Sequence, residues 1–486
     1  MNKTKKSKSS AHHNKKYIED NSTLTKKTQP NSIIYEEPEL TTTIQIDDPL
    51  LKTFQKFQKK VERGSMFNST VTLISFSPLI MIFFLRYTLE ISGILLCVCL
   101  ISLFGFNSFF TLYLNMKVIT QTQSDSYHSL LQNKVHNIHL TRLYHLSSLL
   151  YLICLNLVMA YLIMKMINNL FCAFSLNNEK EKALSSTIII ICMLFLFEQL
   201  PLLLNTNNFF ISQTFAMLFF VIILLSAFTL MLEIIIFSDN INMNFSLIKE
   251  VNFKYSYCIC IYSLLFNNNP NLPREIKEMN YYKYRRGKTL IERTEILEWV
   301  VYILFSLFSY FIDSSYNSNS NSIMTFITIH KQYKNYPMML FEILIIICLG
   351  FKIAHNSTQM WDTFFLQFHS QKNNLKIFLK IVSTILIDVL IFFLDEKSIL
   401  IIISIGGCFC SYILEYVIPI YSYNTIFDFG EEDGEAKLLQ PQLEQSVFKH
   451  SESIHIMNYI VSLLMLLLYL FGIGGTLYCV ITNQIY

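Results

Sequence analysis

Long apolar segments separated by polar stretches dominate the chain after residue 64. A helix needs about 20 residues to cross the hydrocarbon core of a bilayer, and several segments reach that length. Residues 91–114 and 456–486 contain no charged side chain. The pattern predicts an all-α, polytopic transmembrane protein with about 9–11 membrane segments. The apolar segments are 67–86, 90–114, 146–169, 184–205, 209–237, 298–313, 337–354, 376–394, 398–424 and 456–482.

The first part of the chain has a different character. Residues 1–49 are rich in Lys, Ser, Thr and Asn and contain no apolar core, which predicts a disordered cytosolic tail and no cleavable signal peptide. In residues 50–63 the leucine and phenylalanine side chains share one helical face and lysines occupy the rest. This arrangement predicts an amphipathic helix at the membrane interface. The multi-span transmembrane domain then comprises residues 64–486.

The distribution of basic residues poses a topological question. Cytosolic loops carry an excess of Lys and Arg, so the basic N-terminus is expected in the cytosol. Five crossings before residue 238 would then place the basic residues between 274 and 293 on the opposite side. The rule is restored if 251–266 crosses or enters the membrane, or if 184–205 is re-entrant. The sequence leaves both solutions open.

The amino-acid composition excludes several classes of soluble protein. Of the 486 residues, 52% are hydrophobic and 15% are charged, whereas soluble domains carry about 25% charge. A cytosolic enzyme, a nucleic-acid-binding protein and a disordered scaffold are therefore excluded. The net charge of +3 is too small to indicate a polyanionic partner. We expect membrane lipids as partners, no nucleic acid, and residence in the endoplasmic reticulum or another endomembrane, while a homo-oligomer stays open.

Ionisable residues within apolar segments are candidate functional groups. Each costs a few kcal/mol in hydrocarbon unless it is paired or faces water. Glu198 stands three residues before Pro201, so it can line a cavity beside a broken helix, and Asp388 lies deep within its segment. These two buried polar candidates are consistent with a hydrated path in a channel, scramblase or transporter. Positions at the membrane interface are the alternative.

The sequence gives no indication of a metal or a bound cofactor. The histidines lie in loops or at the ends of segments, and the Cys-x-Cys pairs have no partner at zinc-ligand spacing. Nucleotide-binding glycine loops and nucleophile elbows are also missing from the sequence. Gly472, Gly474 and Gly475 are expected to form a helix-packing face.

Residues 251–299 form the most distinctive pattern. An apolar, Tyr-rich segment leads through three asparagines to Pro273-Arg274, and a basic linker leads to Glu298-Trp299. This pattern resembles the sterol and diacylglycerol O-acyltransferase branch of the membrane-bound O-acyltransferases. That branch also combines a disordered N-terminus with an amphipathic lead-in and early spans.

Two further motifs carry the resemblance and its consequence. Asn356 matches the Asn of the family's aromatic-basic-Asp-Trp-Trp-Asn motif, and Glu415 and Tyr416 match the end of its His-Glu-Tyr motif. Leu414 stands where the family has its catalytic His, and leucine cannot accept a proton. The resemblance implies a lipid-handling protein whose cavity is lined by Asn356, Glu415 and Tyr416. It would use acyl-CoA as co-substrate if it is an enzyme, or be a catalytically inactive relative.

Other interpretations remain beside this one. Glu198-x-x-Pro201 is similar to an element of the XK-related scramblases, and Tyr478 with Gln484 is similar to the closing motif of insect gustatory-type receptor channels. A structural or assembly subunit without chemistry is a further alternative. We find no internal repeat in the sequence.

Overall fold

The computed structural model describes residues 66–76, 79–122, 124, 126–174, 209–236, 249, 252–278, 284–316, 336–368, 373–432 and 452–482. Every regular element within these ranges is helical, and five helices are long and apolar enough to cross a membrane. The predicted all-α, polytopic membrane fold is therefore confirmed. In chain order the elements are α2 (Met66–Phe76), η1 (Leu79–Phe84), α3 (Leu85–Ser92), α4 (Ile94–Thr122), α5 (Tyr127–Asn133), α6 (Ile138–Phe174), α8 (Phe209–Ile236), α9 (Tyr255–Leu265), η3 (Asn269–Asn271), α10 (Leu272–Glu278), α11 (Tyr284–Tyr316), α13 (Tyr336–Phe368), α14 (Asn373–Ile391), α15 (Glu396–Ser404), η4 (Ile405–Cys410), η5 (Ile413–Val417), α16 (Ile418–Glu432) and α18 (Glu452–Ile481).

Most apolar segments of the sequence correspond to helices, with one marked difference. Segment 298–313 lies in the second half of α11, which begins at Tyr284. Segment 251–266 forms α9, and all of its helical residues are buried. The apolar segment 184–205, the N-terminal tail and the amphipathic stretch 50–63 lie outside the described residues.

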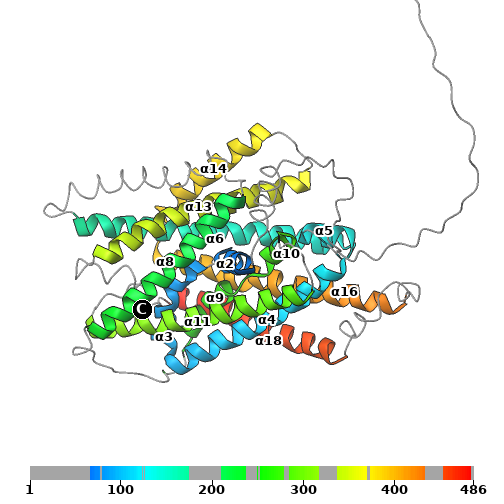
Figure 1. The fold of residues 1–486 in the computed structure, drawn as a ribbon, viewed down its shortest axis with the longest axis horizontal. Coiled ribbons are helices and arrows are strands. Elements are labelled where there is room, and N and C mark those ends of the chain that lie inside the picture. Colours follow the sequence, from blue (N-terminus) through cyan, green and yellow to red (C-terminus); the bar gives the residue numbers. More distant parts are fainter. Residues whose placement is uncertain are drawn as a thin grey trace, which may run out of the picture.

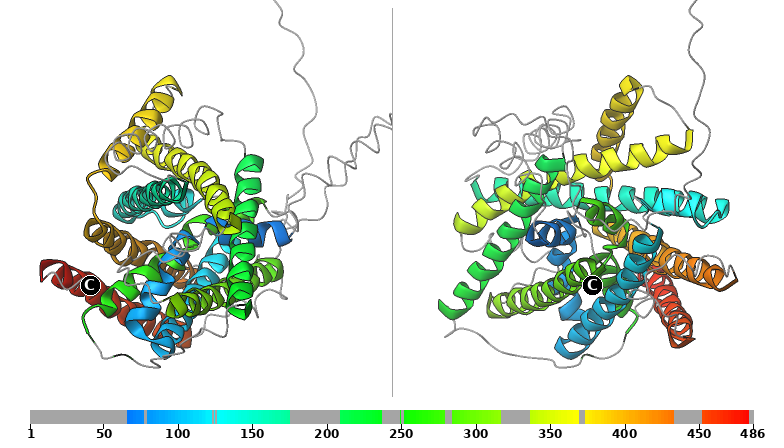
Figure 2. Two further views of the ribbon diagram at one scale, coloured as in Figure 1. Left: turned by 90° about the vertical axis from the view of Figure 1, so that its left-hand side faces the viewer. Right: turned by 45° about the vertical axis from the view of Figure 1, so that its right-hand side comes forward.

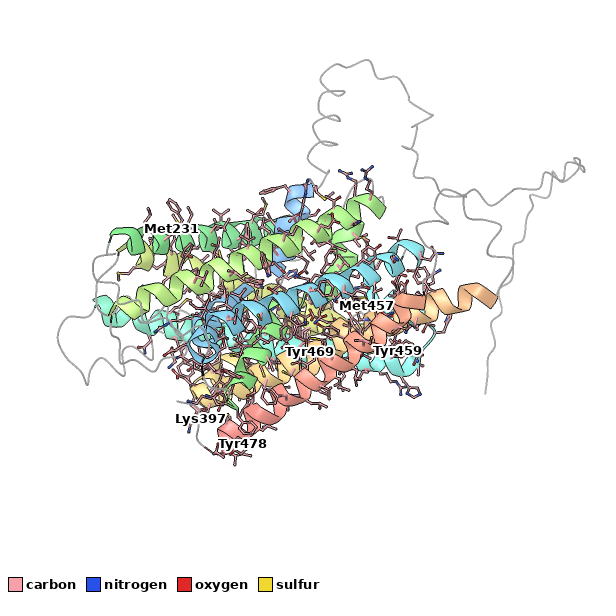
Figure 3. The ribbon with its side chains drawn as sticks, turned by 90° about the horizontal axis from the view of Figure 1, so that it is seen from below. Met231, Lys397, Met457, Tyr459, Tyr469 and Tyr478 are labelled. Atoms are coloured by element: carbon pink, nitrogen blue, oxygen red, sulfur yellow. The ribbon has the colours of Figure 1, made fainter. Side chains whose placement is uncertain are left out.

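Apolar side chains cover much of the outer surface. Along α18, Tyr459, Leu463 and Leu467 are exposed, whereas Tyr469 is 2% exposed. Figure 3 shows Tyr459 and Tyr478 toward opposite ends of α18, with Tyr469 between them. A contiguous apolar exterior is unfavourable in water but suits contact with lipid, which agrees with a membrane location. Further large exposed apolar side chains include Leu218, Val221, Leu225 and Phe228 on α8, and Phe378, Leu386 and Val389 on α14.

The helices pack in pairs that join distant parts of the chain. α6 and α13 lie together, and α4 and α11 form a second pair (Figure 1). Viewed along two other directions, α18 lies beside α9 at the edge of the bundle (Figure 2). The short helix α9 also packs on α3, α4, α15 and η4, and all of its residues are buried.

The contacts reveal two architecturally matched halves. Each half begins with a helix in pieces, α2–η1–α3 and α9–η3–α10, which is followed by the long helices α4 and α6, or α11 and α13. The matched long helices contact each other across the halves, α4 with α11 and α6 with α13, and the two broken helices meet where α3 contacts α9. α8 packs on α2, α11 and α13, and the α15–α16 region packs on α9, α4 and α6 in the reciprocal way. Reciprocal contacts of this kind indicate an internal pseudo-twofold relation.

The interruption after α9 follows from the local sequence. Asparagine side chains compete for backbone hydrogen bonds, and Pro270 lacks the N–H that a continuous helix needs. The carbonyl of Phe266 accepts from the Ser108 hydroxyl at 2.9 Å, and that of Leu265 accepts from the Tyr302 hydroxyl at 3.2 Å. Neighbouring helices thus satisfy backbone groups that water cannot reach.

Two π-helical turns distort the helix between Glu396 and Glu432. They are η4 and η5, and Ser411 lies between them with its hydroxyl on the carbonyl of Gly406 at 3.2 Å. Such turns insert an extra residue into a helix and are frequent at functional sites. The second turn carries Glu415.

The predicted glycine face on α18 is confirmed in two of its three positions. A Cβ atom at Gly472 would lie 2.5 Å from Sγ of Cys408, and one at Gly475 would lie 2.6 Å from Cβ of Ser256. A Cβ at Gly474 would meet nothing within 4 Å. Gly472 and Gly475 therefore let α18 approach η4 and α9 closely.

Asp395 gives a stability prediction outside the spans. Its carboxylate caps α15 by accepting from the Ser398 backbone N–H at 2.8 Å and from the Ser398 hydroxyl at 2.6 Å, which lowers the pKa of Asp395. We expect Asp395→Ala to destabilise the protein by about 1 kcal/mol at neutral pH.

The same cap has a defined pH dependence. Because the folded-state pKa is lowered, the carboxylate's contribution is present above the unfolded pKa of about 3.9 and is lost as the pH falls through the folded value. Thermal unfolding of the protein in detergent, followed as a function of pH, measures this loss of stability. Asp395→Asn keeps a capping side chain, so it should retain stability at neutral pH and lose this titration. Equal acid sensitivity of wild type and Asp395→Asn would contradict the assignment.

Candidate functional site

Three carboxylates are buried around the interruption of α9. Glu295 and Glu298 on α11 are 6% and 0% exposed, and Glu415 on η5 is 1% exposed. Residues three apart share a helix face, so both side chains of α11 point inward. Glu295 and Glu415 are close enough for their charges to repel each other.

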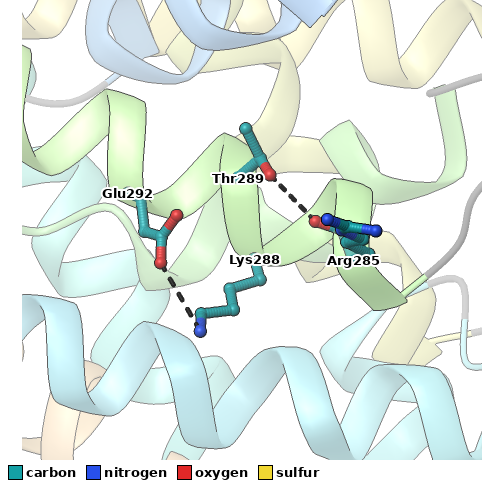
Figure 4. Close-up of polar contacts among 4 residues, drawn as sticks. All are labelled: Arg285, Lys288, Thr289 and Glu292. Carbon is teal, nitrogen blue, oxygen red and sulfur yellow. Dashed lines mark hydrogen bonds and ion pairs between the residues drawn. The ribbon is translucent and has the colours of Figure 1, made fainter.

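The preceding turn of α11 points to the surface instead. Glu292 pairs with Lys288 at 3.7 Å, and both side chains are more than 40% exposed, at 42% and 49%. Figure 4 shows this pair beside the bond from the Thr289 hydroxyl to the Arg285 carbonyl. The helix therefore has one polar face in water and one polar face in the core.

Asn268 connects the three carboxylates. Its Nδ2 donates to Oε2 of Glu298 at 2.8 Å. The same side chain lies within hydrogen-bonding reach of Glu295, and the backbone N–H of Asn268 lies close to Glu415. That N–H donates to the Phe266 carbonyl at 3.0 Å, two residues back instead of the four of a regular helix, so the interruption places it there.

Polar side chains on one face of α4 contact the interruption after α9 from the opposite side. Ser108, Thr111 and Asn115 are spaced three and four apart and therefore share that face. The Ser108 hydroxyl lies 2.9 Å from Oε1 of Glu295, and Nδ2 of Asn269 donates to the Thr111 hydroxyl at 2.9 Å. Nδ2 of Asn115 donates to Oδ1 of Asn269 at 3.0 Å. These bonds fix the asparagine run against α4.

Two further contacts complete the polar cluster. Nδ2 of Asn267 donates to the Ser411 hydroxyl at 2.9 Å, which joins the break to the helix that carries Glu415. On the other side, the Lys352 ammonium of α13 is close enough to Glu298 to interact with its charge. Its Nζ also lies 5.6 Å from the ring centre of Phe219.

Tyrosine rings form one wall of this cluster. Tyr416 stacks on Tyr412 at 6.0 Å between ring centres and meets Tyr469 edge-on at 5.8 Å. On another side, Tyr127 of α5 is buried. Burial, followed by the nearby Tyr144 and Glu415, raises the pKa of Tyr127 well above its usual value. Glu415 thus lies close to tyrosine side chains.

The structure separates the three residues of the predicted acyltransferase site. Glu415 and Tyr416 are adjacent in the core, while Asn356 is on α13 and is 5% exposed. Among the hydrogen bonds and ring contacts of the described residues, none joins Asn356 to either of the other two. Their catalytic role stays a prediction.

The two other candidates lie apart from the cluster or beyond the described residues. Asp388 is 9% exposed on α14, which packs chiefly on α13 and α6. Glu198 lies in the range 175–208, outside the described residues.

Sequence reasoning missed Glu295 as a site residue and did not assign a role to Asn268. Both lie outside the apolar segments in which buried polar groups were sought. A useful signal was present in the spacing of Glu295 and Glu298, since an acidic pair three apart next to an apolar segment marks one polar face. The asparagine run followed by Pro270 was a second signal, because it predicts a broken helix.

Over the part of the chain that the structure describes, no group of three His, Cys, Asp or Glu side chains is placed to hold a metal ion. The cluster consists of hydroxyl, amide and carboxylate groups, with the Lys352 ammonium beside Glu298.

Comparisons with known proteins identify a fold and no family. No family model matches the chain, and no curated protein matches it. Among solved structures, it is similar to the crystal structure of a manganese transporter of Eremococcus coleocola in a histidine-to-alanine mutant form, with 13% sequence identity and a TM-score of 0.53. The alignment covers 87% of this chain and 88% of that transporter. The chain shares the fold of a membrane transporter.

This similarity does not support the acyltransferase-like scaffold. The 251–299 pattern that suggested it folds as α9, the interruption, α10 and the first half of α11. Position 414, where the acyltransferase motif requires its histidine, is a leucine 2% exposed in the core.

Proposed function

We propose that the protein is a membrane transporter that carries a small solute through the interface between its two matched halves. The interruption of α9 within a buried polar cluster is the observation that supports this most directly. In many transporters, discontinuous helices at a repeat interface supply the substrate and ion sites, because unwound backbone and helix ends offer unpaired polar groups. Here the interruption brings Asn267 and Asn268 to three carboxylates.

The fold similarity supports the same class of function. The matched protein is a transporter, and its alignment spans most of both chains. From the matched protein we infer only the class of function, a membrane transporter. Manganese is therefore used below as one of several transport probes. The predicted endomembrane location and cytosolic N-terminus are retained as part of this proposal.

The burial of the cluster favours a carrier over an open channel. Glu298 and Glu415 are 0% and 1% exposed, and aromatic rings border Glu415. An open pore would leave such groups in contact with water. A carrier in a closed state shields them and exposes them in turn to each side of the membrane.

Uptake into liposomes tests the proposal. We expect reconstituted wild-type protein to accumulate at least one of three radiolabelled probes, which are manganese, sodium and a neutral amino acid. Glu295→Gln should reduce that uptake at least about tenfold, because glutamine holds this position permanently neutral and removes a carboxyl group that can exchange its proton during transport. Glu292→Gln is the matched control one turn away, and it should transport as wild type.

Two results would contradict the transporter proposal. One is uptake that does not exceed protein-free liposomes for every probe. The other is equal uptake by Glu295→Gln and wild type, which would separate the cluster from the path.

A further inference from the structure

Hydrogen-bond geometry determines which side-chain atoms of Asn267 and Asn268 have no hydrogen-bond partner. Nδ2 of Asn268 donates to a carboxylate oxygen of Glu298, which in its ionised form can only accept. The orientation of this amide is therefore determined. Its Oδ1 is buried and has no hydrogen-bond partner among the described residues, so Asn268 is left with one unpaired acceptor oxygen.

The same reasoning applies to Asn267. The Ser411 hydroxyl lies 3.2 Å from the Gly406 carbonyl, so its single proton is directed there. Asn267 must then present its NH2 group to Ser411, at 2.9 Å. Its Oδ1 is buried and lacks a hydrogen-bond partner within the described ranges. Asn267 thus contributes a second acceptor oxygen.

Ser108 determines the proton count at Glu295. The Ser108 hydroxyl lies 2.9 Å from both the Phe266 carbonyl and Oε1 of Glu295. One hydroxyl proton can serve only one acceptor. Both contacts are satisfied together when Glu295 carries a proton and donates it to Ser108, which donates to Phe266. In this arrangement Glu295 is neutral.

Glu415 is the remaining carboxylate of the cluster. Lys352 lies close enough to Glu298 for their charges to attract each other, and Glu295 is neutral in the arrangement above. Glu415 is 1% exposed, and its Oε1 has no hydrogen-bond partner in the described part of the chain. An isolated buried carboxylate costs several kcal/mol. The atoms without a hydrogen-bond partner here are all oxygens, and a bound cation would supply the partner that they lack.

We propose that the cluster binds one monovalent cation, with the Glu415 carboxylate as its counter-charge and Oδ1 of Asn267 and Asn268 as neutral ligands. The proposal deepens the transporter function and rests on it for the route to the site. Oxygen ligands suit a hard cation. A single uncompensated charge favours a monovalent ion over a divalent one, and an alkali ion and ammonium share this chemistry.

Thermal unfolding of the purified full-length protein tests cation binding without transport. In a background of N-methylglucamine chloride at constant ionic strength, we expect NaCl, KCl or NH4Cl to raise Tm in a saturable way, since a ligand of the native state stabilises it. The three salts distinguish an alkali ion from ammonium. Glu415→Gln should weaken the apparent affinity at least about tenfold, and Glu292→Gln should leave it unchanged.

A second variant keeps the test informative if Glu415→Gln fails to fold. Asn267→Asp adds a second charge at the same place, so its affinity for MgCl2 should rise at least about tenfold over wild type, because divalent ions require more ligand charge. Unchanged MgCl2 affinity in Asn267→Asp would overturn the assignment. Two other results would overturn it. One is a wild-type protein whose Tm is raised by none of the three salts above its value in N-methylglucamine chloride. The other is a Glu415→Gln variant whose Tm responds to the salts as strongly as that of wild type.

Cation binding, measured by Tm, and uptake into liposomes test the cation site and the transporter function separately. Saturable cation binding without uptake of any probe would contradict the transporter proposal and leave the site standing. Uptake that proceeds without any cation-dependent change in Tm would contradict the site and leave the transporter standing.

Discussion

Gly407→Ala is expected to destabilise the protein strongly. A Cβ atom at this position would lie 2.3 Å from the backbone oxygen of Cys260 and 2.7 Å from Oγ of Ser263. A backbone oxygen in the central helix α9 cannot move aside cheaply, so η4 must shift away from it. Overpacking of this kind costs about 1–3 kcal/mol, which corresponds to a fall in Tm of several degrees.

The shift should also reach the polar cluster. Ser411, four residues after Gly407, accepts from Asn267 across the same interface. We therefore expect Gly407→Ala to lose uptake as well as stability. Gly474→Ala is the control, because a Cβ there meets nothing within 4 Å. It should be neutral or stabilise by up to about 1 kcal/mol through helix propensity. Equal Tm values for the two variants would refute the packing argument.

Asn268→Ala is expected to disable the site and to destabilise the fold. It removes the donor to Glu298 and the amide that reaches Glu295, while the carboxylates stay buried. Loss of a buried hydrogen bond to a charged group costs about 2–4 kcal/mol. Thermal unfolding in detergent measures the stability, and liposome uptake measures the site.

Asn133→Ala is the matched control for this change. Asn133 is an exposed asparagine at the end of α5, and surface substitutions usually stay within about 0.5 kcal/mol. Asn268→Asp supplies a second comparison, since it keeps the shape of the side chain but replaces the donor with a fourth acidic group. A stable, transport-competent Asn268→Asp would mean that Asn268 is not the connection between the carboxylates.

Hydropathy located most helices because a membrane allows few alternatives. In hydrocarbon every backbone N–H and C=O has to be bonded internally, so a long apolar segment becomes a helix. Segment 209–237 is α8 (Phe209–Ile236) and segment 456–482 is α18 (Glu452–Ile481). Segment 251–266, which belongs to one of the two topologies that the basic residues after 274 left open, forms the buried helix α9.

Hydropathy was least informative about the helix that carries Glu295 and Glu298. α11 begins fourteen residues before the apolar segment 298–313 that represents it. Its first half carries Glu292 toward water and Glu295 toward the core, and composition cannot distinguish the two. Burial depends on which helix lies opposite, here α4 through Ser108.

The sequence by itself therefore determined the all-α membrane fold and the positions of most helices, since these follow from local patterns and from backbone hydrogen bonding. Only the tertiary structure decided that Asn268 meets Glu295, Glu298 and Glu415, and that the chain consists of two matched halves. These groups are far apart in the chain, and the halves share helix packing without a recognisable sequence repeat. Contacts between helices, which no local pattern records, bring them together.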